Sequence, residues 1–222
     1  MFTGLVEEVG VVNAIRQQSG DWVLEIGATG AFMEDVRLGD SIAVNGVCLT
    51  VTSMRGKGFR ADVSRETSAH TSIAAWRSGV KVNLEKAMQL SARLGGHLVS
   101  GHVDGVGELI SKQEDARSLR LSIRAPEDLL RYIAAKGSIT VDGVSLTVND
   151  IAGSEMSLNI VPHTAHATTL GGLKTGSLVH LEVDLLARYT ERLLFCASAE
   201  KSDAKTSTIS KEFLAQHGFY KS

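Results

Sequence analysis

The sequence is poor in cysteine and has neither a long apolar run nor a cluster of one charge. Its only cysteines, Cys48 and Cys196, do not make a disulfide framework, so a reducing cytosol is the expected location. The apolar runs are far shorter than the roughly 20 residues that a membrane span needs, and the opening MFTGLVEEVG lacks the features of a signal peptide. With 25 acidic and 23 basic residues and no Lys/Arg cluster, the chain is not expected to bind nucleic acid. We therefore expect a cytoplasmic protein without membrane contact.

What the sequence does contain is an internal repeat of 97 residues. Gly4–Gly10 aligns with Gly101–Gly107, and SIAVNGVCLTV at Ser41–Val51 aligns with SITVDGVSLTV at Ser138–Val148. Roughly 22 of the 85 positions 2–86 are identical to their partners. The period exceeds the roughly 20–50 residues of a solenoid unit. The 222 residues are therefore expected to form two copies of one small domain.

Short β-rich runs separated by Gly-containing turns dominate both copies. Asn45-Gly46 and Asp142-Gly143 predict type I′ hairpin turns, which need positive φ at both central residues. Strands at this density predict an all-β fold with a small barrel or sandwich in each half, and six strands per copy are enough to close a barrel. The expected strands are Val9–Ile15, Trp22–Ile26, Ser41–Val44, Cys48–Met54, Phe59–Val63 and Val80–Leu84, followed by Val106–Ile110, Leu119–Ile123, Ser138–Val141, Ser145–Ile151, Met156–Val161 and Leu178–Val183.

Helical periodicity begins only at Asp184, in a segment that has no copy in the first half. Its apolar stripe either packs on a neighbouring subunit or folds back on its own barrel. We expect an N-terminal barrel and connector at 1–96, a C-terminal barrel at 97–183, and an oligomerisation helix and tail at 184–222. The tail 201–208 is polar, and a short last helix is expected at Ile209–His217; another helix is expected after Pro126. The stripe consists of Leu185, Leu186, Tyr189, Leu193 and Leu194.

Two repeated or glycine-rich motifs are candidates for chemistry. Thr50 and Thr147 hold the same place in NGVCLTV and DGVSLTV, where they either bind a ligand or satisfy local backbone groups. The segment GGHLVSGHVDG at Gly95–Gly105 holds two histidines among glycines, which suit the close approach of a planar ligand. His102 is then a candidate proton acceptor or donor, with a structural role as the alternative. Two cysteines, of which only Cys48 lies within a repeat copy, are a poor zinc set, so no metal site is predicted.

These motifs carry a resemblance to the riboflavin synthase family. The opening MFTGLVEEVG, the paired NGVCLTV and DGVSLTV, GGHLVSGHVDG and IVPHTAHATTLG occur in the order and spacing of that family, over residues 1 to about 194. The resemblance implies two six-stranded Greek-key barrels and a C-terminal helix through which three subunits associate. It also implies that two molecules of 6,7-dimethyl-8-ribityllumazine exchange a four-carbon unit to give riboflavin and 5-amino-6-ribitylaminouracil, one lumazine in each barrel, without a redox or metal cofactor. Association with lumazine synthase is left open.

The family's ligand positions transfer to matching segments in each half. The active site is expected to pair the N-terminal barrel of one subunit with the C-terminal barrel of the next. Ser41 and Asp142 are expected either behind the residues that touch the ligand or on its ribityl side. The N-barrel pocket is expected to use Gly4, Leu5, Val6, Cys48, Leu49, Thr50, Asp62, Val63, Ser64, Arg65, Glu66 and Thr67, and the C-barrel pocket Gly101, His102, Val103, Lys136, Ser145, Leu146, Thr147, Asn159, Ile160, Val161, Pro162, His163 and Thr164.

Differences between the copies predict unequal roles for two identical ligands. His102 aligns with Leu5, Ser145 with Cys48 and Lys136 with Gly39. One lumazine must lose a proton from its 7-methyl group, and we assign this proton to His102, with Ser145 and Thr147 orienting the ligand. The other lumazine must accept a nucleophile at C7, which Cys48 and Thr50 are expected to assist; hydrophobic packing is the alternative for this cysteine. The assignment of donor and acceptor to the two barrels stays open.

Two other functions are compatible with this kind of fold. A non-catalytic lumazine- or flavin-binding protein, such as an optical antenna, needs only one intact pocket, whereas both LTV motifs and both Thr67 and Thr164 are intact here. A flavin-binding reductase needs a nicotinamide-binding α/β partner domain, which this sequence lacks. The repeat therefore favours the enzyme.

Overall fold

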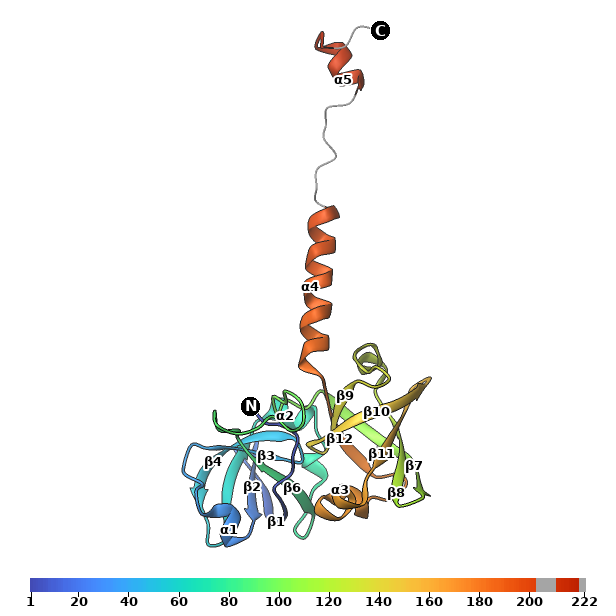
Figure 1. Ribbon diagram of the computed structural model, residues 1–222. Coiled ribbons are helices and arrows are strands. Elements are labelled where there is room, and N and C mark those ends of the chain that lie inside the picture. Colours follow the sequence, from blue (N-terminus) through green and yellow to red (C-terminus); the bar gives the residue numbers. More distant parts are fainter. Residues whose placement is uncertain (203–210, 220–222) are drawn as a thin grey trace. The chain divides into compact units, whose positions relative to one another are not determined.

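The computed structural model describes residues 1–202 and 211–219, which form two compact units, Met1–Leu185 and Leu186–Ser222 (Figure 1). The first unit contains both barrels. The second contains most of α4 (Leu185–Ser202) and all of α5 (Lys211–Gln216). The expected helix after Asp184 is confirmed, and α5 falls within the last expected helix. Residues 203–208 of the expected polar tail lie outside the described residues.

The twelve strands form two closed antiparallel barrels, as the repeat predicts. The strand order is β1-β2-β5-β4-β3-β6 in the first barrel and β10-β11-β8-β7-β12-β9 in the second (Figure 1). Closure leaves no free sheet edge along most of each barrel. The strands are β1 Glu8–Gln18, β2 Asp21–Gly27, β3 Ser41–Val44, β4 Val47–Met54, β5 Gly58–Val63, β6 Lys81–Lys86, β7 Gly105–Asp115, β8 Ser118–Arg124, β9 Ser138–Val141, β10 Val144–Ala152, β11 Glu155–Ile160 and β12 Leu178–Val183.

Each barrel is filled by its own set of buried apolar side chains. Leu24, Ile26 and Phe59 belong to the first core, and Leu109 and Leu121 to the second; none is more than 1% exposed. Alternation along a strand places every second side chain inside. The predicted type I′ turns are confirmed: φ is 46° and 80° at Asn45-Gly46 and 47° and 77° at Asp142-Gly143.

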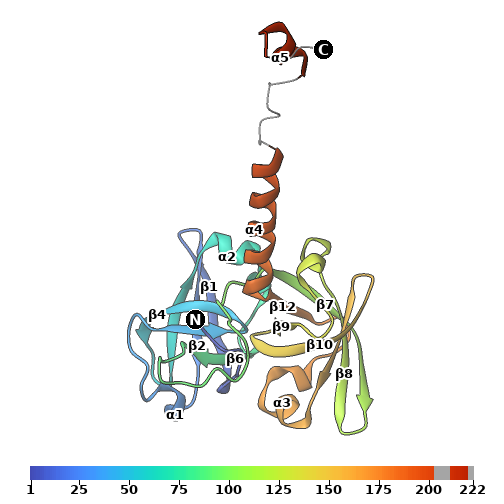
Figure 2. The same ribbon diagram turned by 45° about the horizontal axis from the view of Figure 1, so that its top comes forward.

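Short helices fill the gaps between strands. Helix α2 packs against β2 and α3 against β8, in matching places of the two barrels (Figure 2). The helix expected after Pro126 is confirmed: Glu127–Tyr132 forms a 3-10 helix, and the chain extends again at Ile133. The short helices are α1 Gly30–Met33, α2 Arg65–Ala69 and α3 Pro162–Ala167, with 3-10 turns at Ile73–Ala75, Glu127–Tyr132 and Thr169–Gly172. No described helix has the length and apolar character that crossing a bilayer requires.

The two barrels join through contacts that repeat the 97-residue relationship. Phe2 and Val99, which are repeat partners, form an antiparallel β-bridge with each other. Asn83 of the first barrel donates from Nδ2 to the carbonyl oxygen of Asp142, and His180, its repeat partner, contacts the carbonyl oxygen of Asn45. The halves are therefore held face to face by reciprocal bonds, which fixes one barrel's opening relative to the other's.

Candidate functional site

Each barrel opens at the same place, where two neighbouring strands stop pairing. The β4–β5 pairing ends at Val51–Ala61 and the β10–β11 pairing at Val148–Leu158, and both pairs lie next to a register shift. Such bulges increase local twist and bend the strand away from its partner. Within the part of the chain that the structure describes, no strand pairing joins Cys48–Thr50 to 62–64, or Ser145–Thr147 to 159–161. These strand edges can offer hydrogen bonds to a planar ligand.

In the first barrel this opening is a cavity of about 260 Å³. Thr67 stands at the start of α2, where its backbone N–H donates to the Ser64 hydroxyl at 3.1 Å and caps the helix. Sequence reasoning missed Val47, His70 and Thr71, whose positions show no distinctive spacing. The lining residues are Val47, Cys48, Glu66, Thr67, His70, Thr71, Gly101, His102 and Val103.

The structure corrects the expected grouping of the two pockets, because the glycine segments cross between barrels. Gly101–Val103 belongs to the second half but lines the cavity at Cys48, where the Cys48 N–H donates to the Gly101 carbonyl at 2.8 Å. Reciprocally, the Ser145 N–H donates to the carbonyl of Gly4 at 2.8 Å. His102 therefore faces the first-barrel site, and the Gly4 segment faces the second. A linear alignment cannot reveal this exchange, since it depends on how the two halves pack.

Only glycine fits at the two crossing points. Gly4 and Gly101 adopt φ of 75° and 81°, a left-handed conformation that other residues rarely adopt. A Cβ at Gly4 would lie 2.6 Å from Cβ of Ser145, and one at Gly101 would lie 2.6 Å from Cβ of Cys48. The repeated glycines thus bring each segment's backbone against the strand edge of the opposite barrel.

Two buried carboxylates hold the crossing segments in place. Glu182 accepts hydrogen bonds from the N–H and hydroxyl of Ser100, both at 2.7 Å, and from the Gly101 N–H at 3.0 Å. Its repeat partner Glu85 binds Thr3 and Gly4 in the same way. Burial raises the pKa of both glutamates, while the donated hydrogen bonds oppose that rise. Each carboxylate thereby rigidifies a wall of the neighbouring barrel's opening.

The two histidines of GGHLVSGHVDG have different surroundings. His102 is exposed and lines the first-barrel cavity, whereas His97 is half-buried and its Nδ1 lies 2.8 Å from the Ser145 hydroxyl. Sequence reasoning selected His102 and missed His97, because nothing in the spacing shows that His97 reaches Ser145 across 48 residues.

Several expected site residues point elsewhere. Asp142 is only 4% exposed and lies between the barrels, where it accepts from the His180 N–H at 2.8 Å, so its carboxylate is engaged at the barrel boundary. Arg65 turns away from the cavity to bond the Gly20 carbonyl at 3.2 Å. The side chains of Leu49, Val63 and Ile160 point into the barrel cores, which leaves only their backbones for a ligand, and Leu146 packs partly against the second core.

The remaining expected residues lie on or beside the splayed strands. Lys136 lies two residues before β9 and is exposed, with φ of 67°. Its N–H donates to the Val148 carbonyl at 2.7 Å. Thr50, Asp62, Ser64, Thr147, Asn159, Val161 and His163 are exposed, and Val6, Pro162 and Thr164 are half-buried.

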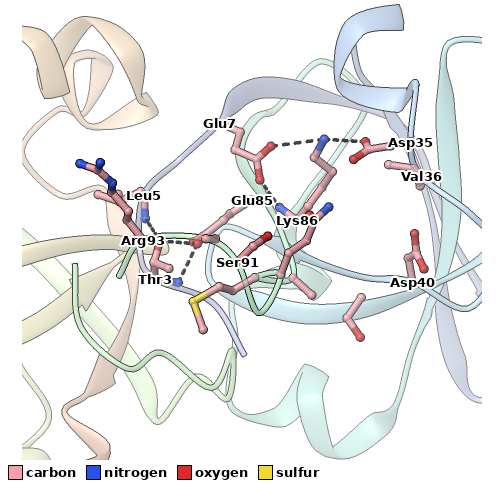
Figure 3. Close-up of a pocket in the computed structure, with 15 residues that line it drawn as sticks. Thr3, Leu5, Glu7, Asp35, Val36, Asp40, Glu85, Lys86, Ser91 and Arg93 are labelled. Atoms are coloured by element: carbon pink, nitrogen blue, oxygen red, sulfur yellow. Dashed lines mark hydrogen bonds and ion pairs between the residues drawn. The ribbon is translucent and has the colours of Figure 1, made fainter. Parts of the chain in front are cut away.

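A larger cavity of about 560 Å³ lies between the first barrel and the connector after β6 (Figure 3). Lys86 bridges its wall, 2.7 Å from Asp35 and 3.5 Å from Glu7. Of the expected site residues, it includes only Leu5 and Ser41. We place the candidate site at the smaller cavity, because that cavity is built from the repeated segments and the larger one is walled by the connector.

Comparison with known proteins identifies the family. A family model described as the lumazine binding domain matches residues 3–87 and again 100–184. The riboflavin synthases of Photobacterium phosphoreum and Bacillus subtilis are 46% and 40% identical over 219 residues, which cover 99% of this chain and 99% and 100% of theirs. A crystal structure of LumP complexed with 6,7-dimethyl-8-(1'-D-ribityl) lumazine matches with a TM-score of 0.76 at 27% identity, covering 82% of this chain and 99% of that one. The chain belongs to the riboflavin synthase family and carries two lumazine binding domains.

Proposed function

We propose that the protein catalyses the dismutation of two molecules of 6,7-dimethyl-8-ribityllumazine into riboflavin and 5-amino-6-ribitylaminouracil. The protein is thus a transferase that moves a four-carbon unit between two copies of one substrate. The observation that carries this proposal is full-length identity of 40–46% to riboflavin synthases, with both lumazine binding domains present.

Each barrel opening supplies one lumazine site. The splayed edge beside Cys48 and the matching edge beside Ser145 offer backbone donors and acceptors of the kind that the pyrimidine edge of the ring requires. Thr67 and Thr164 stand at the matching helix starts and add hydroxyl groups. The crossing segments Gly4–Val6 and Gly101–Val103 cover the rings. We also propose three regions on this basis: the N-terminal barrel and connector at 1–96, the C-terminal barrel at 97–183, and an oligomerisation helix and tail at 184–222.

The chemistry requires positioning more than a strong base. The 7-methyl group of one lumazine is acidic because its carbanion is delocalised into the ring, and C7 of the other is electrophilic. Holding two reactants in near-attack geometry contributes up to roughly 7–11 kcal/mol in favourable intramolecular models. In the first barrel, Cys48 and His102 both line the cavity, so we move His102 from its expected role as proton acceptor to assisting addition at C7 together with Cys48. In the second barrel, Ser145 and Thr147 occupy the matching positions.

We further propose that the catalytic assembly is a cytoplasmic homotrimer. Helix α4 carries large exposed apolar side chains, among them Tyr189 at 62%, Leu193 at 69% and Phe195 at 63% exposure, which a neighbouring subunit would cover. The first-barrel cavity of about 260 Å³ is below the usual 300–1,000 Å³ of a ligand site, which supports a site completed by the second barrel of another subunit. The free cysteines Cys48 and Cys196 suit a reducing compartment.

The competing function is lumazine binding without catalysis. LumP shares the fold, but at 27% identity it is less similar to this chain than the riboflavin synthases are. Incubation of the purified protein with the lumazine alone separates the two functions: we expect riboflavin and the uracil product in equal amounts. Binding without riboflavin would establish the non-catalytic function instead. Co-sedimentation with lumazine synthase tests that protein as a partner.

A further inference from the structure

A histidine outside the predicted site is hydrogen-bonded to the serine of the second barrel. Nδ1 of His97 lies 2.8 Å from Oγ of Ser145, a distance typical of a well-formed hydrogen bond. Ser145 is the repeat partner of Cys48, which lines the first-barrel cavity, so it occupies the corresponding place in the second opening.

The local backbone is built to deliver His97 to this place. A Cβ at Gly96 would collide with the Thr3 carbonyl oxygen and lie 2.9 Å from Cβ of Ser145, so only glycine permits this approach. The His97 N–H donates to that same Thr3 carbonyl at 3.2 Å. Thr3 is in turn fixed by the Glu85 carboxylate, at 2.6 Å from its N–H and 2.7 Å from its hydroxyl. The imidazole is therefore positioned by a connected set of hydrogen bonds.

The imidazole is suited to receive a proton. Burial lowers the pKa of His97 below its ordinary value, an effect that the nearby Asp184 carboxylate opposes, so the ring is neutral at neutral pH. Within residues 1–202 and 211–219, Nε2 of His97 is buried and has no hydrogen-bond partner. A neutral ring whose Nδ1 accepts the Ser145 hydroxyl proton leaves the Ser145 oxygen lone pairs available to a ligand.

We propose that His97 is a positioning residue that acts through Ser145 to deprotonate the lumazine bound in the second barrel. As the 7-methyl C–H bond breaks, its proton forms a new O–H bond to Ser145 Oγ, and the original hydroxyl proton of Ser145 passes to Nδ1 of His97. The electron pair of the C–H bond remains on the lumazine as a delocalised carbanion, and His97 becomes an imidazolium. This inference rests on the proposed function and deepens it.

The first barrel has different surroundings at the same position. Cys48 packs against the apolar cluster of Phe2, Ala43 and Val99. A hydrogen-bonded histidine therefore accompanies Ser145, whereas an apolar cluster accompanies Cys48. Since only one of the two identical lumazines must lose a proton, this difference assigns the carbanion to the second barrel and the electrophilic C7 to the first.

The test compares variants of the full-length protein that separate hydrogen bonding from proton transfer. His97→Asn keeps an amide near the Nδ1 position but cannot accept a proton at neutral pH. Ser145→Ala removes the relay atom, and His217→Asn, which replaces an exposed histidine directly after α5, is the matched control. For each variant we would measure kcat and KM for riboflavin formation over a pH series, riboflavin affinity by fluorescence, and exchange of the 7-methyl protons with D₂O by NMR.

We expect His97→Asn to lower kcat and methyl exchange by about 100-fold or more, in the range of general acid–base contributions, with KM and riboflavin affinity within about threefold. The fall in kcat at low pH should disappear in this variant. The double variant should be no slower than Ser145→Ala, because the two residues act as one unit. Two results would overturn the inference while leaving the proposed function intact. The first is an active wild type with a His97→Asn variant whose kcat is within threefold of it. The second is a double variant whose loss of kcat equals the product of the two single losses. An inactive wild type would instead refute the function.

Discussion

Nδ1 of His180 lies 2.9 Å from the carbonyl oxygen of Asn45, across the boundary between the two barrels. The same imidazole accepts the Ser72 N–H at its Nε2, 3.0 Å away, and stacks on Trp76. Its repeat partner Asn83 accepts the Thr169 N–H at 2.8 Å in the mirrored arrangement. One half therefore uses a neutral amide where the other uses an imidazole, and this imidazole must stay uncharged to accept at Nε2.

Burial gives this boundary two opposing pH dependences. Burial raises the pKa of Asp142 to about 7 and lowers that of His180 to about 4. Asp142 gains a proton on folding, so its contribution to stability weakens as the pH rises from about 4 to 7. His180 loses a proton on folding, so its contribution weakens as the pH falls from 6.5 to about 4. In the wild type these two slopes largely cancel.

Asp142→Asn should expose the pH dependence of His180. The substitution installs the residue found at the repeat partner Asn45, so the turn geometry is retained. We expect the free energy of unfolding to increase by about 3 kcal/mol between pH 4 and 6.5 relative to the wild-type profile. In His180→Asn only the Asp142 dependence remains, so the free energy of unfolding should fall as the pH rises toward 7. Urea unfolding at a series of pH values measures both, and parallel profiles for wild type and variants would refute this assignment.

Gly101→Ala should be far more destabilising than an alanine placed at an open turn. Both Gly101 and Gly153 have positive φ, at 81° and 60°, so both substitutions introduce backbone strain of about 1 kcal/mol. Only at Gly101 would the new methyl also meet Cβ of Cys48 at 2.6 Å and the Phe2 ring at 2.8 Å, whereas Gly153 has open space. In urea unfolding, we expect the free energy of unfolding to fall by roughly 1 kcal/mol for Gly153→Ala and by at least about 3 kcal/mol for Gly101→Ala. Equal losses would show that the crossing segment is not tightly packed.

The architecture could be predicted from the sequence because its signals are local. Alternation along the strands and the Asn45-Gly46 and Asp142-Gly143 turns depend on neighbouring residues alone, and the expected strands match the observed ones to within a few residues. Because of the repeat, each strand and turn pattern occurs twice, so each half supports the prediction made for the other. The helix start after Pro126 was equally local, although the pattern does not distinguish a 3-10 helix from an α-helix, since both begin with the same residues.

The site was less predictable because it depends on contacts between the halves. The alignment placed Gly4 beside Cys48 and Gly101 beside Ser145, whereas the structure exchanges them. Asp142 read as a ligand contact, yet its carboxylate serves the barrel boundary. His97 was passed over because its partner Ser145 is distant in the sequence. Pairwise similarity identifies which segments line a pocket, but the packing of two copies decides whose pocket they line.

The exchange of segments predicts a crossed effect of the two buried glutamates. Glu182 lies in the second barrel but holds Ser100 and Gly101, whose segment lines the cavity at Cys48. Glu182→Gln replaces one acceptor oxygen by a donor, so we expect lumazine binding in the first barrel to weaken by about 10-fold or more. The measurement uses a Cys196→Ser background, in which Cys48 is the only cysteine. The slowing of Cys48 modification by a thiol reagent as lumazine is added then reports binding at that site alone.

Glu85→Gln is the matched control, since it loosens the Gly4 segment over the second barrel. Protection of Cys48 should then stay close to that of the Cys196→Ser parent. If Glu85→Gln weakened protection and Glu182→Gln did not, the uncrossed grouping expected from the alignment would be correct after all.

The apolar stripe of α4 predicts how the proposed trimer is held. Leu186, Tyr189 and Leu193 recur at helical spacing and are 62%, 62% and 69% exposed, whereas Arg192 lies beside them on the same helix. Leu193→Asp places a charge in the stripe, so sedimentation equilibrium should show a shift from trimer to monomer, and riboflavin formation should fall steeply because each active site needs two subunits. Arg192→Asp changes the charge one residue away and should leave the trimer intact. If the Leu193→Asp protein sediments like the wild type, this stripe is not the subunit contact, and the contact lies on the barrels instead.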